Sequence, residues 1–224
     1  ERAAFNIINF TSTGFEASGV IDETNENGQA YIYMAIRRGT KVPESGTEVF
    51  NVATRTSGLP SFKAPFAVDM GLVRKATNTL GGVYNASRLT GTKFLYTNGT
   101  DAEANDNGFV WDFMDGFAND GGANSTVISW MWKRAPGYFD AVAYTGDSPG
   151  GVGVQTVSHN LGVAPEMIWF KRRDSTGGWG VLVTALGTVE SGGIEYGQGA
   201  YLNETSAFAT SGWWGSPYVA PTAT

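Results

Sequence analysis

The sequence has no cysteine and a single histidine, His159, among its 224 residues. Without cysteine there is no disulfide, no thiolate metal site and no thiol nucleophile, so packing or oligomerisation must stabilise the protein outside a cell. One imidazole leaves little from which to build a histidine metal site or a Ser-His-Asp centre. No residue set predicts a cofactor, and we expect none.

Charge and long apolar runs are also scarce. Charged residues make up 16% of the chain, and the net charge of -6 opposes attraction to nucleic acid or anionic membranes. No apolar run approaches the roughly 18 residues that a membrane-spanning helix needs, and no signal segment opens the chain. We therefore expect no nucleic-acid partner and no membrane insertion. The chain begins at Glu1 without a methionine, which suggests a processed product or a piece of a longer protein.

Short β-branched and aromatic runs dominate what is present, separated by clusters of Gly, Asn, Asp, Ser and Pro. Aromatic residues reach 13% beside 31 glycines, a combination typical of many short strands joined by tight turns. The sequence therefore predicts an all-β protein. Strands are expected over Tyr31–Arg38, Phe50–Thr56, Val68–Lys75, Lys93–Asn98, Phe109–Met114, Val127–Arg134, Phe139–Gly146, Gly153–His159, Glu166–Arg172, Trp179–Leu186 and Ala200–Asn203.

Several of these runs match one another at a nearly constant spacing, which indicates a duplicated unit of about 96 residues. Their order is preserved, and loop insertions account for the drifting offset. The matches are "YIYMAIRR" at 31 with "VISWMWKR" at 127 (offset 96), "FNVATRT" at 50 with "FDAVAYT" at 139 (89), "VDMGLVRK" at 68 with "PEMIWFKR" at 165 (97), and Asn98 of "FLYTNGT" with Asn203 of "AYLNETS" (105).

The repeat divides the chain into three parts. Residues 1–38 resemble the last third of a unit, residues 39–134 form one complete β unit, and residues 135–224 form a second unit that lacks its last third. We predict two related units like β-sandwiches or jelly rolls. The end piece 1–38 is expected to complete the second unit, within one chain as a circular permutation or between subunits by strand exchange.

Four long segments resemble a known family. They are "YIYMAIRRGTKVPESGTEVFNV", "SRLTGTKFLYTNGTDAE", "ISWMWKRAPGYFDAVAYTGDS" and "VSHNLGVAPEMIWFKRRDSTGGW". Together they are similar to the repeated β domains of virion proteins from tailed bacteriophages, particularly marine and cyanobacterial phages, of the kind labelled tail fibre or appendage proteins. The resemblance covers nearly the whole chain and carries no catalytic residues with it.

The resemblance implies a non-enzymatic structural protein of the virion. Such a protein would assemble as a homo-oligomer, for example a trimer, contact other virion proteins and attach to polysaccharide on the host surface. Two alternatives stay open: a capsid decoration or adaptor protein without a host ligand, and a polysaccharide depolymerase. The depolymerase would need a pair of carboxylates, and no sequence feature selects one.

Basic and aromatic residues are the candidate contacts for glycan or for neighbouring subunits. Basic clusters close aromatic strands at matched positions, which predicts a cationic rim on each unit, although charges at strand ends also keep apolar strands soluble. The flanking glycines of "GWWGSP" favour an exposed aromatic loop. These candidates are Arg37, Arg38, Lys133, Arg134, Lys171, Arg172, Arg173, Trp213 and Trp214.

An acidic segment offers a weak candidate for a metal site. Asp101, Glu103 and Asp112 fall on calcium-loop spacings, but Asp106 stands where the sharp turn of an EF-hand needs glycine. The structural alternative is a polar loop whose Asp and Asn side chains cap turns. His159 has no matched counterpart in the first unit, and we expect a turn residue that makes a hydrogen bond.

Overall fold

A computed structural model describes residues 8–10, 15–17, 42–75, 82–119, 124–147, 155–210 and 220–223. The chain divides into two compact units, Glu1–Gly39 and Thr40–Thr224. Within the first, β1 (Ile8–Phe10) and β2 (Phe15–Ala17) pair as an antiparallel hairpin. In the part of the chain that is described, no helix is long and apolar enough to cross a membrane.

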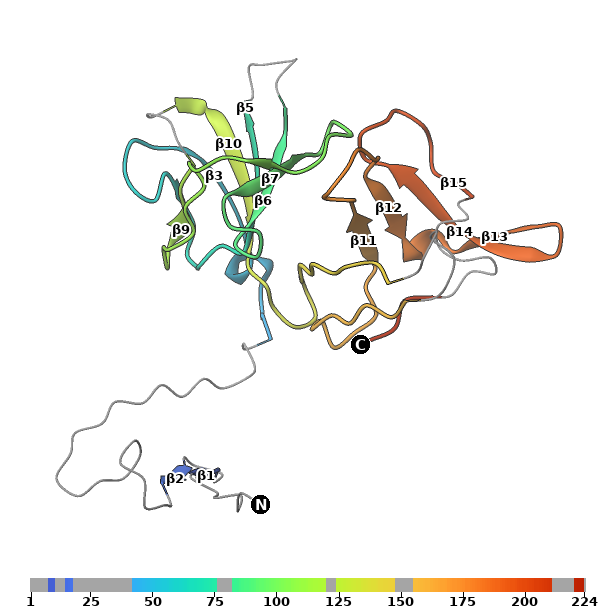
Figure 1. Ribbon diagram of the computed structural model, residues 1–224, viewed down its shortest axis with the longest axis horizontal. Coiled ribbons are helices and arrows are strands. Elements are labelled where there is room, and N and C mark those ends of the chain that lie inside the picture. Colours follow the sequence, from blue (N-terminus) through green and yellow to red (C-terminus); the bar gives the residue numbers. More distant parts are fainter. Residues whose placement is uncertain are drawn as a thin grey trace, which may run out of the picture. The chain divides into compact units, whose positions relative to one another are not determined.

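The second unit holds an antiparallel sheet of six strands (Figure 1). Side chains alternate between its faces, as in β5, where Gly71 and Val73 are buried between less buried neighbours. Met131 of β10 is likewise fully buried, whereas Trp130 and Trp132 lie on the opposite face, because successive side chains of a strand point to opposite faces. The strand order is β3 (Phe50–Arg55), β10 (Asn124–Trp132), β5 (Met70–Lys75), β6 (Tyr84–Ser87), β7 (Lys93–Tyr96) and β8 (Ala104–Asn105).

A two-stranded ribbon provides the other layer of the first core. Its strands are β4 (Phe62–Lys63) and β9 (Gly116–Phe117), and both phenylalanines are fully buried. The Phe62 and Phe117 rings stack at 5.1 Å, and Trp111 stacks on Phe117 at 4.8 Å. Gly71 of β5 leaves the space that the Phe117 ring fills, because a Cβ there would lie 2.8 Å from the ring. The 3-10 helix η1 (Gly46–Glu48) precedes β3.

The second antiparallel sheet is built from later parts of the chain. Its core is smaller, with Trp179, Val181 and Leu182 as its buried hydrophobic residues. Gly180 lies against the Phe170 ring, 2.1 Å from where a Cβ would stand. The order is β11 (Met167–Phe170), β12 (Gly180–Val183), β14 (Ile194–Tyr201) and β13 (Thr188–Ser191), with β15 (Ala209–Thr210) also paired to β14 and the 3-10 helix η3 (Thr184–Leu186) following β12.

The all-β prediction is confirmed, but three predicted strands are wrong. Phe109–Met114 contains a single bridge, Val110 to Ala118, although Phe109 and Trp111 are buried and Val110 is exposed as in a strand. The Phe113 amide donates to the Trp111 carbonyl at 2.9 Å, a local bond that no strand ladder contains. Phe139–Gly146 keeps a bridge at Phe139 alone, and residues 155–159 of the third prediction form no strand. The predicted strand Tyr31–Arg38 lies outside the described residues.

One observed hairpin, which joins β13 to β14, was not predicted from the sequence. Its two-residue turn is Gly192–Gly193, with φ of 63° and 78°. Positive φ at both central residues is the requirement of a type I′ turn, which Gly-Gly satisfies without strain. The Gly-Gly pair in the sequence therefore indicated a hairpin. The strand before it, β13, was not predicted because its residues are mostly polar and exposed.

Candidate functional site

The acidic and basic candidate segments meet around Glu103. Its carboxylate accepts from Arg173 at 2.6 Å and pairs with Lys93 at 3.2 Å, and the Glu103 amide donates to the Arg173 carbonyl at 2.8 Å. The Glu103 side chain is only 11% exposed. A residue considered for metal binding and a residue considered for glycan contact are therefore partners of one another.

Two further hydrogen bonds continue this contact between the sheets. The Gly177 amide donates to the Thr100 carbonyl, and Trp179 Nε1 donates to the Tyr96 carbonyl, each at 2.8 Å. Trp179 is 4% exposed. We call residues 96–103 and 173–179 the seam: it fastens the loop after β7 to the loop before β12, so its charges serve the fold.

Burial and ion pairs shift the pKa values of two seam residues and of the neighbouring Lys171. Burial raises the pKa of Glu103, but hydrogen bonds and attraction from Arg173 and Lys93 outweigh burial and hold the pKa below its usual value. Burial raises the pKa of Tyr96, and burial lowers the pKa of Lys171, which donates to the carbonyls of Arg172 and Ser175. Glu103 therefore stays ionised at neutral pH.

Acid should weaken the fold through Glu103. Because its folded pKa lies below the unfolded value of about 4.3, its stabilisation is complete above that value and is lost as the pH falls through the folded pKa. Glu103→Gln should lower the free energy of unfolding by about 1 kcal/mol at neutral pH, a modest value because Arg173 and Lys93 are partly exposed. Urea unfolding should show this difference shrinking as the pH falls below the unfolded value and through the lowered folded pKa.

Glu190→Gln is the matched control, because it removes the same charge from an exposed position on β13. Its effect on the free energy of unfolding should stay within about 0.5 kcal/mol. A Glu103→Gln difference that persisted unchanged at low pH would contradict the assignment, since it would reflect lost packing rather than lost charge.

Arg134 is occupied by a second ion pair. It pairs with Asp140, whose side chain is 4% exposed and also accepts from the Asn160 and Ala141 amides. Burial raises the pKa of Asp140, but these hydrogen bonds and Arg134 lower it overall. Asp140 ties the loop after β10 to the loop before β11, and its position inside an expected strand gave no signal of that role.

The remaining basic and aromatic candidates do not form one cluster. Arg172 pairs with Asp174 at 2.7 Å in an exposed pair, and Lys133 donates its amide to the Val49 carbonyl. Lys133, Arg134 and the 171–173 segment thus lie at the ends of β10 and β11 as expected, with local partners. The candidates Arg37, Arg38, Trp213 and Trp214 lie outside the described residues.

The acidic candidates do not gather around a metal position. Asp101 and Asp112 are exposed, and within the described ranges no three His, Asp or Glu side chains lie close enough together to hold a metal ion. Asp106 caps its own turn, accepting from the Gly108 amide at 2.9 Å. This is the turn-capping role that the structural alternative predicts.

His159 makes two local hydrogen bonds. Its Nε2 lies 3.0 Å from the Thr222 carbonyl, and its Nδ1 accepts from the Leu161 amide at 3.2 Å. Both ring nitrogens are therefore engaged with backbone, which confirms the expectation of a hydrogen-bonded turn residue.

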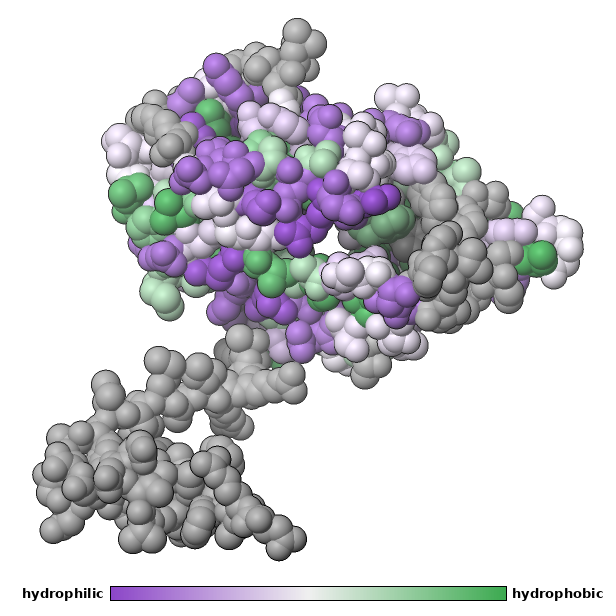
Figure 2. Space-filling model, viewed as in Figure 1, coloured by the Kyte–Doolittle hydropathy of each residue, from purple (hydrophilic) through white to green (hydrophobic). Residues whose placement is uncertain are grey.

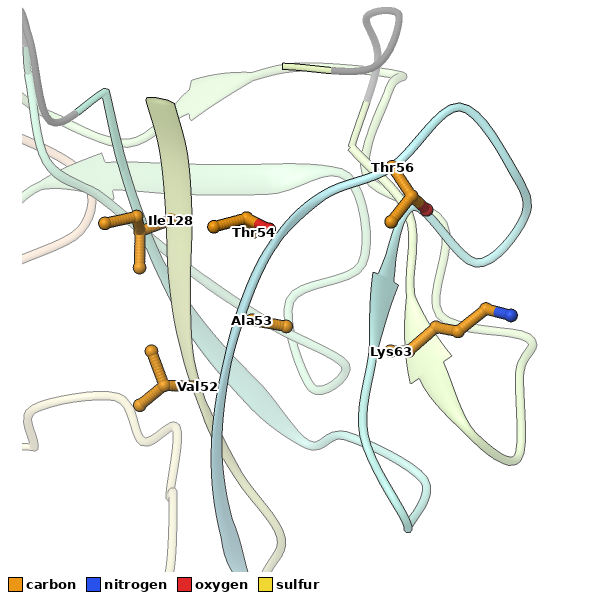
Figure 3. A pocket seen from close by; sticks show the side chains of 6 residues that line it. All are labelled: Val52, Ala53, Thr54, Thr56, Lys63 and Ile128. Carbon is orange, nitrogen blue, oxygen red and sulfur yellow. The ribbon is translucent and has the colours of Figure 1, made fainter. Parts of the chain in front are cut away.

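The first sheet also carries a shallow, open hollow of about 480 Å³. Figure 3 shows Val52 and Ile128 on one side of it and Thr56 and Lys63 of the β4 side on the other. Its lining offers methyl groups, two threonine hydroxyls and one ammonium group, without an acid or a histidine. Lys63 is the one titratable side chain of this lining.

Comparison with known proteins gives one match. A family model described as "Domain of unknown function (DUF7483)" matches residues 66–218, about two thirds of the chain. No curated protein and no solved structure matches the sequence.

Proposed function

The chain belongs to the DUF7483 family, and we propose that it is a non-enzymatic structural protein of a phage virion, a tail fibre or appendage domain that assembles with copies of itself and attaches to host-surface glycan. The family description assigns no activity. The proposal rests on the resemblance to phage appendage domains and on one surface of the unit Thr40–Thr224.

That surface is formed by two loops that lie side by side. The Gly137 amide donates to the Leu161 carbonyl at 2.7 Å, and the Asn160 amide donates to Asp140 at 2.8 Å, so residues 135–147 and 155–167 are held together. We call them the loop surface. It exposes large apolar side chains, namely Tyr138 (43%), Val142 (44%), Tyr144 (59%), Val163 (50%) and Met167 (54%).

Exposed apolar side chains on two joined loops favour binding to another molecule. Monomeric proteins rarely expose contiguous apolar patches, and such patches mark interaction sites. On the face drawn in Figure 2, hydrophilic side chains cover most of the described surface and hydrophobic ones occur in small groups. Tyrosine suits both subunit interfaces and the apolar face of a sugar ring, because it combines a flat apolar body with a hydroxyl. The loop surface therefore supports assembly and attachment.

The charged groups support binding rather than hydrolysis. A glycosidase needs two carboxylates free to face a substrate, one of them with a raised pKa. The two most shielded acids with shifted pKa values, Glu103 and Asp140, have lowered pKa values and are bound to arginines. They hold loops in place.

Binding to purified bacterial surface polysaccharides and to whole cells tests the proposal. Labelled protein should bind saturably without releasing reducing ends, and light scattering should give an oligomer mass. Tyr144→Ser should weaken glycan binding or assembly roughly threefold to tenfold, the effect of losing one aromatic contact of about 0.5–1.5 kcal/mol. Leu59→Ser is the matched control, because Leu59 is 74% exposed and belongs to the first sheet's loops.

Two outcomes would count against the proposal. Release of reducing ends would make the protein a depolymerase, and a monomer that binds no glycan would remove both parts of the proposed role. Equal losses for Tyr144→Ser and Leu59→Ser would show that the loop surface is not the contact.

A further inference from the structure

Three strands of each sheet follow one pairing scheme. In the first sheet β5 pairs with β6 and β6 with β7, and in the second β11 pairs with β12 and β12 with β14, all antiparallel. Adding 97 to the residue numbers of β5, 96 to those of β6 and 105 to those of β7 gives the residues that pair in β11, β12 and β14. The converted pairs are Met70↔Ser87 to Met167↔Val183, Val73↔Tyr84 to Phe170↔Gly180, and Tyr84↔Tyr96 to Gly180↔Tyr201.

The turn beside these strands repeats the same hydrogen bonds. Asn98 Oδ1 accepts from the Val83 amide at 2.9 Å, and Asn203 Oδ1 accepts from the Trp179 amide at 2.8 Å. The next bond also recurs, from the Thr97 amide to the Val83 carbonyl and from the Leu202 amide to the Trp179 carbonyl. Both sheets therefore use the asparagine that the sequence matches at an offset of 105 in the same way.

A glycine and a tyrosine recur in the same contact. A Cβ on Gly82 would lie 2.2 Å from the Tyr96 ring, and a Cβ on Gly178 would lie 2.4 Å from the Tyr201 ring. Each tyrosine lies over a glycine just before β6 or β12. The side chains thus agree with the registers, and strand β11 takes the place in its sheet that β5 takes in the first.

The two sheets differ on the far side of these strands. In the first sheet β10 pairs with β5 on the side away from β6, and β3 pairs in turn with β10. In the second sheet β11 is the end of the order, and within the described residues it pairs with β12 alone (Figure 1). Among the described strands, none stands beside β11 in the place that β10 takes beside β5.

The missing counterpart of β10 beside β11 in the described part of the chain explains why Phe139–Gly146 forms no regular strand. The sequence matches this segment to β3, and β3 pairs with no strand other than β10 among those described. Among the described strands the segment has no counterpart of β10 to pair with, and an isolated strand leaves its backbone groups unpaired. Val142 and Tyr144 are accordingly 44% and 59% exposed.

We propose that the open edge of β11 receives the segment Tyr31–Arg38 of a second copy of this chain. By sequence alone, "YIYMAIRR" matches the part of β10 that begins at Val127, at an offset of 96. If Tyr31–Arg38 pairs with β11 in the register in which β10 pairs with β5, Ile36 lies opposite Met167 and Ala35 lies opposite Ile168. An added strand satisfies the free N–H and C=O groups of a sheet edge, the mode of recognition known as β-augmentation.

Charge favours this occupant. In the first sheet Asp69 stands just before β5, and its Oδ2 accepts from the Arg134 amide at 2.7 Å. Its match before β11 is the exposed Glu166, whose carboxylate has no ion pair among the described residues. The same register brings Arg37 opposite Glu166. The incoming strand therefore brings the basic residue Arg37 to the position opposite the Glu166 carboxylate.

The source of the strand is a second copy because the proposed function has the chain assemble with copies of itself. The donor segment belongs to the unit Glu1–Gly39, and the receiving edge belongs to the unit Thr40–Thr224. A strand given by one copy and received by the next is a head-to-tail contact, which yields rings or filaments. This partner rests on the proposed function, since it specifies how an appendage protein assembles.

Engineered cysteines test the register directly, because the chain has none of its own. The double variant Ile36→Cys with Met167→Cys should form covalent dimers and longer ladders on oxidation, since opposite residues of antiparallel strands lie within disulfide reach. Met167 is 54% exposed, so its replacement leaves the core intact. Ala35→Cys with Ile168→Cys is a second pair in the same register.

The matched control is Ala35→Cys with Met167→Cys, which shifts the register by one residue and places the thiols on opposite faces. It should cross-link at least tenfold more slowly. Cross-links only within single chains would overturn the second copy as the source, and equal rates for control and test would overturn the register. An oligomer without specific cross-links would leave the proposed assembly standing and remove this contact, whereas a monomer would remove both.

Discussion

Phe117→Ala should lower the free energy of unfolding by about 3–5 kcal/mol, the usual cost of removing a large aromatic side chain from a core. Phe117 is fully buried, stacks on Phe62 at 5.1 Å and on Trp111 at 4.8 Å, and fills the space above Gly71. The cavity opens between the ribbon and the six-stranded sheet. Neither layer can close it, because both are fixed by their own hydrogen bonds.

Urea unfolding followed by tryptophan fluorescence measures this loss. Met114→Ala is the control, because Met114 lies in the same segment but is 82% exposed, and its effect should stay within about 0.5 kcal/mol. A loss for Phe117→Ala below about 1 kcal/mol would mean that the ribbon is not a layer of the core.

Trp179→Ala should have an effect of similar size, about 3–5 kcal/mol, but confined to the second sheet. Trp179 is one of only three buried hydrophobic residues of that sheet in the described ranges, and its Nε1 donates to the Tyr96 carbonyl across the seam. Removing it deletes packing and a hydrogen bond together. Calorimetry should show the unfolding of the second sheet move to lower temperature, apart from that of the first.

Trp179→Phe separates the two contributions. It keeps most of the apolar burial and removes the Nε1 donor, so the loss should be about 1–2 kcal/mol. Hydrogen exchange should then increase at the Gly177 amide, whose bond to Thr100 lies in the same seam. A single cooperative transition for Trp179→Ala, shifted as a whole, would show that the two sheets unfold as one body.

Both experiments bear on the proposed role. If the protein assembles through the edge of β11, the seam supports that strand, because Arg173 follows β11 closely and Trp179 directly precedes β12. Variants that weaken the seam should therefore also weaken assembly, whereas Phe117→Ala should not do so before the first sheet unfolds.

The sequence predicted the strands whose apolar residues alternate. Val68–Lys75, Val127–Arg134 and Glu166–Arg172 all overlap observed strands. A strand with one buried face places apolar residues at every second position, as β5 does. Phe109–Met114 failed because it has the composition and the alternating burial of a strand but makes only one bridge, Val110 to Ala118. Composition does not distinguish a strand from a loop that supplies core side chains.

Candidate site residues were less predictable than strands. Sequence reasoning placed Arg173 on a binding rim and Glu103 near a possible metal, although they are 70 positions apart in the chain and bonded to each other. No local signal joins such a pair. Only folding brings the loop after β7 to the loop before β12, and the ion pair of Glu103 with Arg173 then stabilises the fold.

The sequence by itself determined that this protein is all-β, and it contained the matched segments around Asn98 and Asn203, because alternation and turn residues act over a few positions. The tertiary structure decided which matched segments became strands. Phe139–Gly146 resembles β3 and still forms no strand, since strand formation requires a neighbour to share backbone hydrogen bonds. That neighbour is set by the sheet as a whole, at a distance that no local pattern reaches.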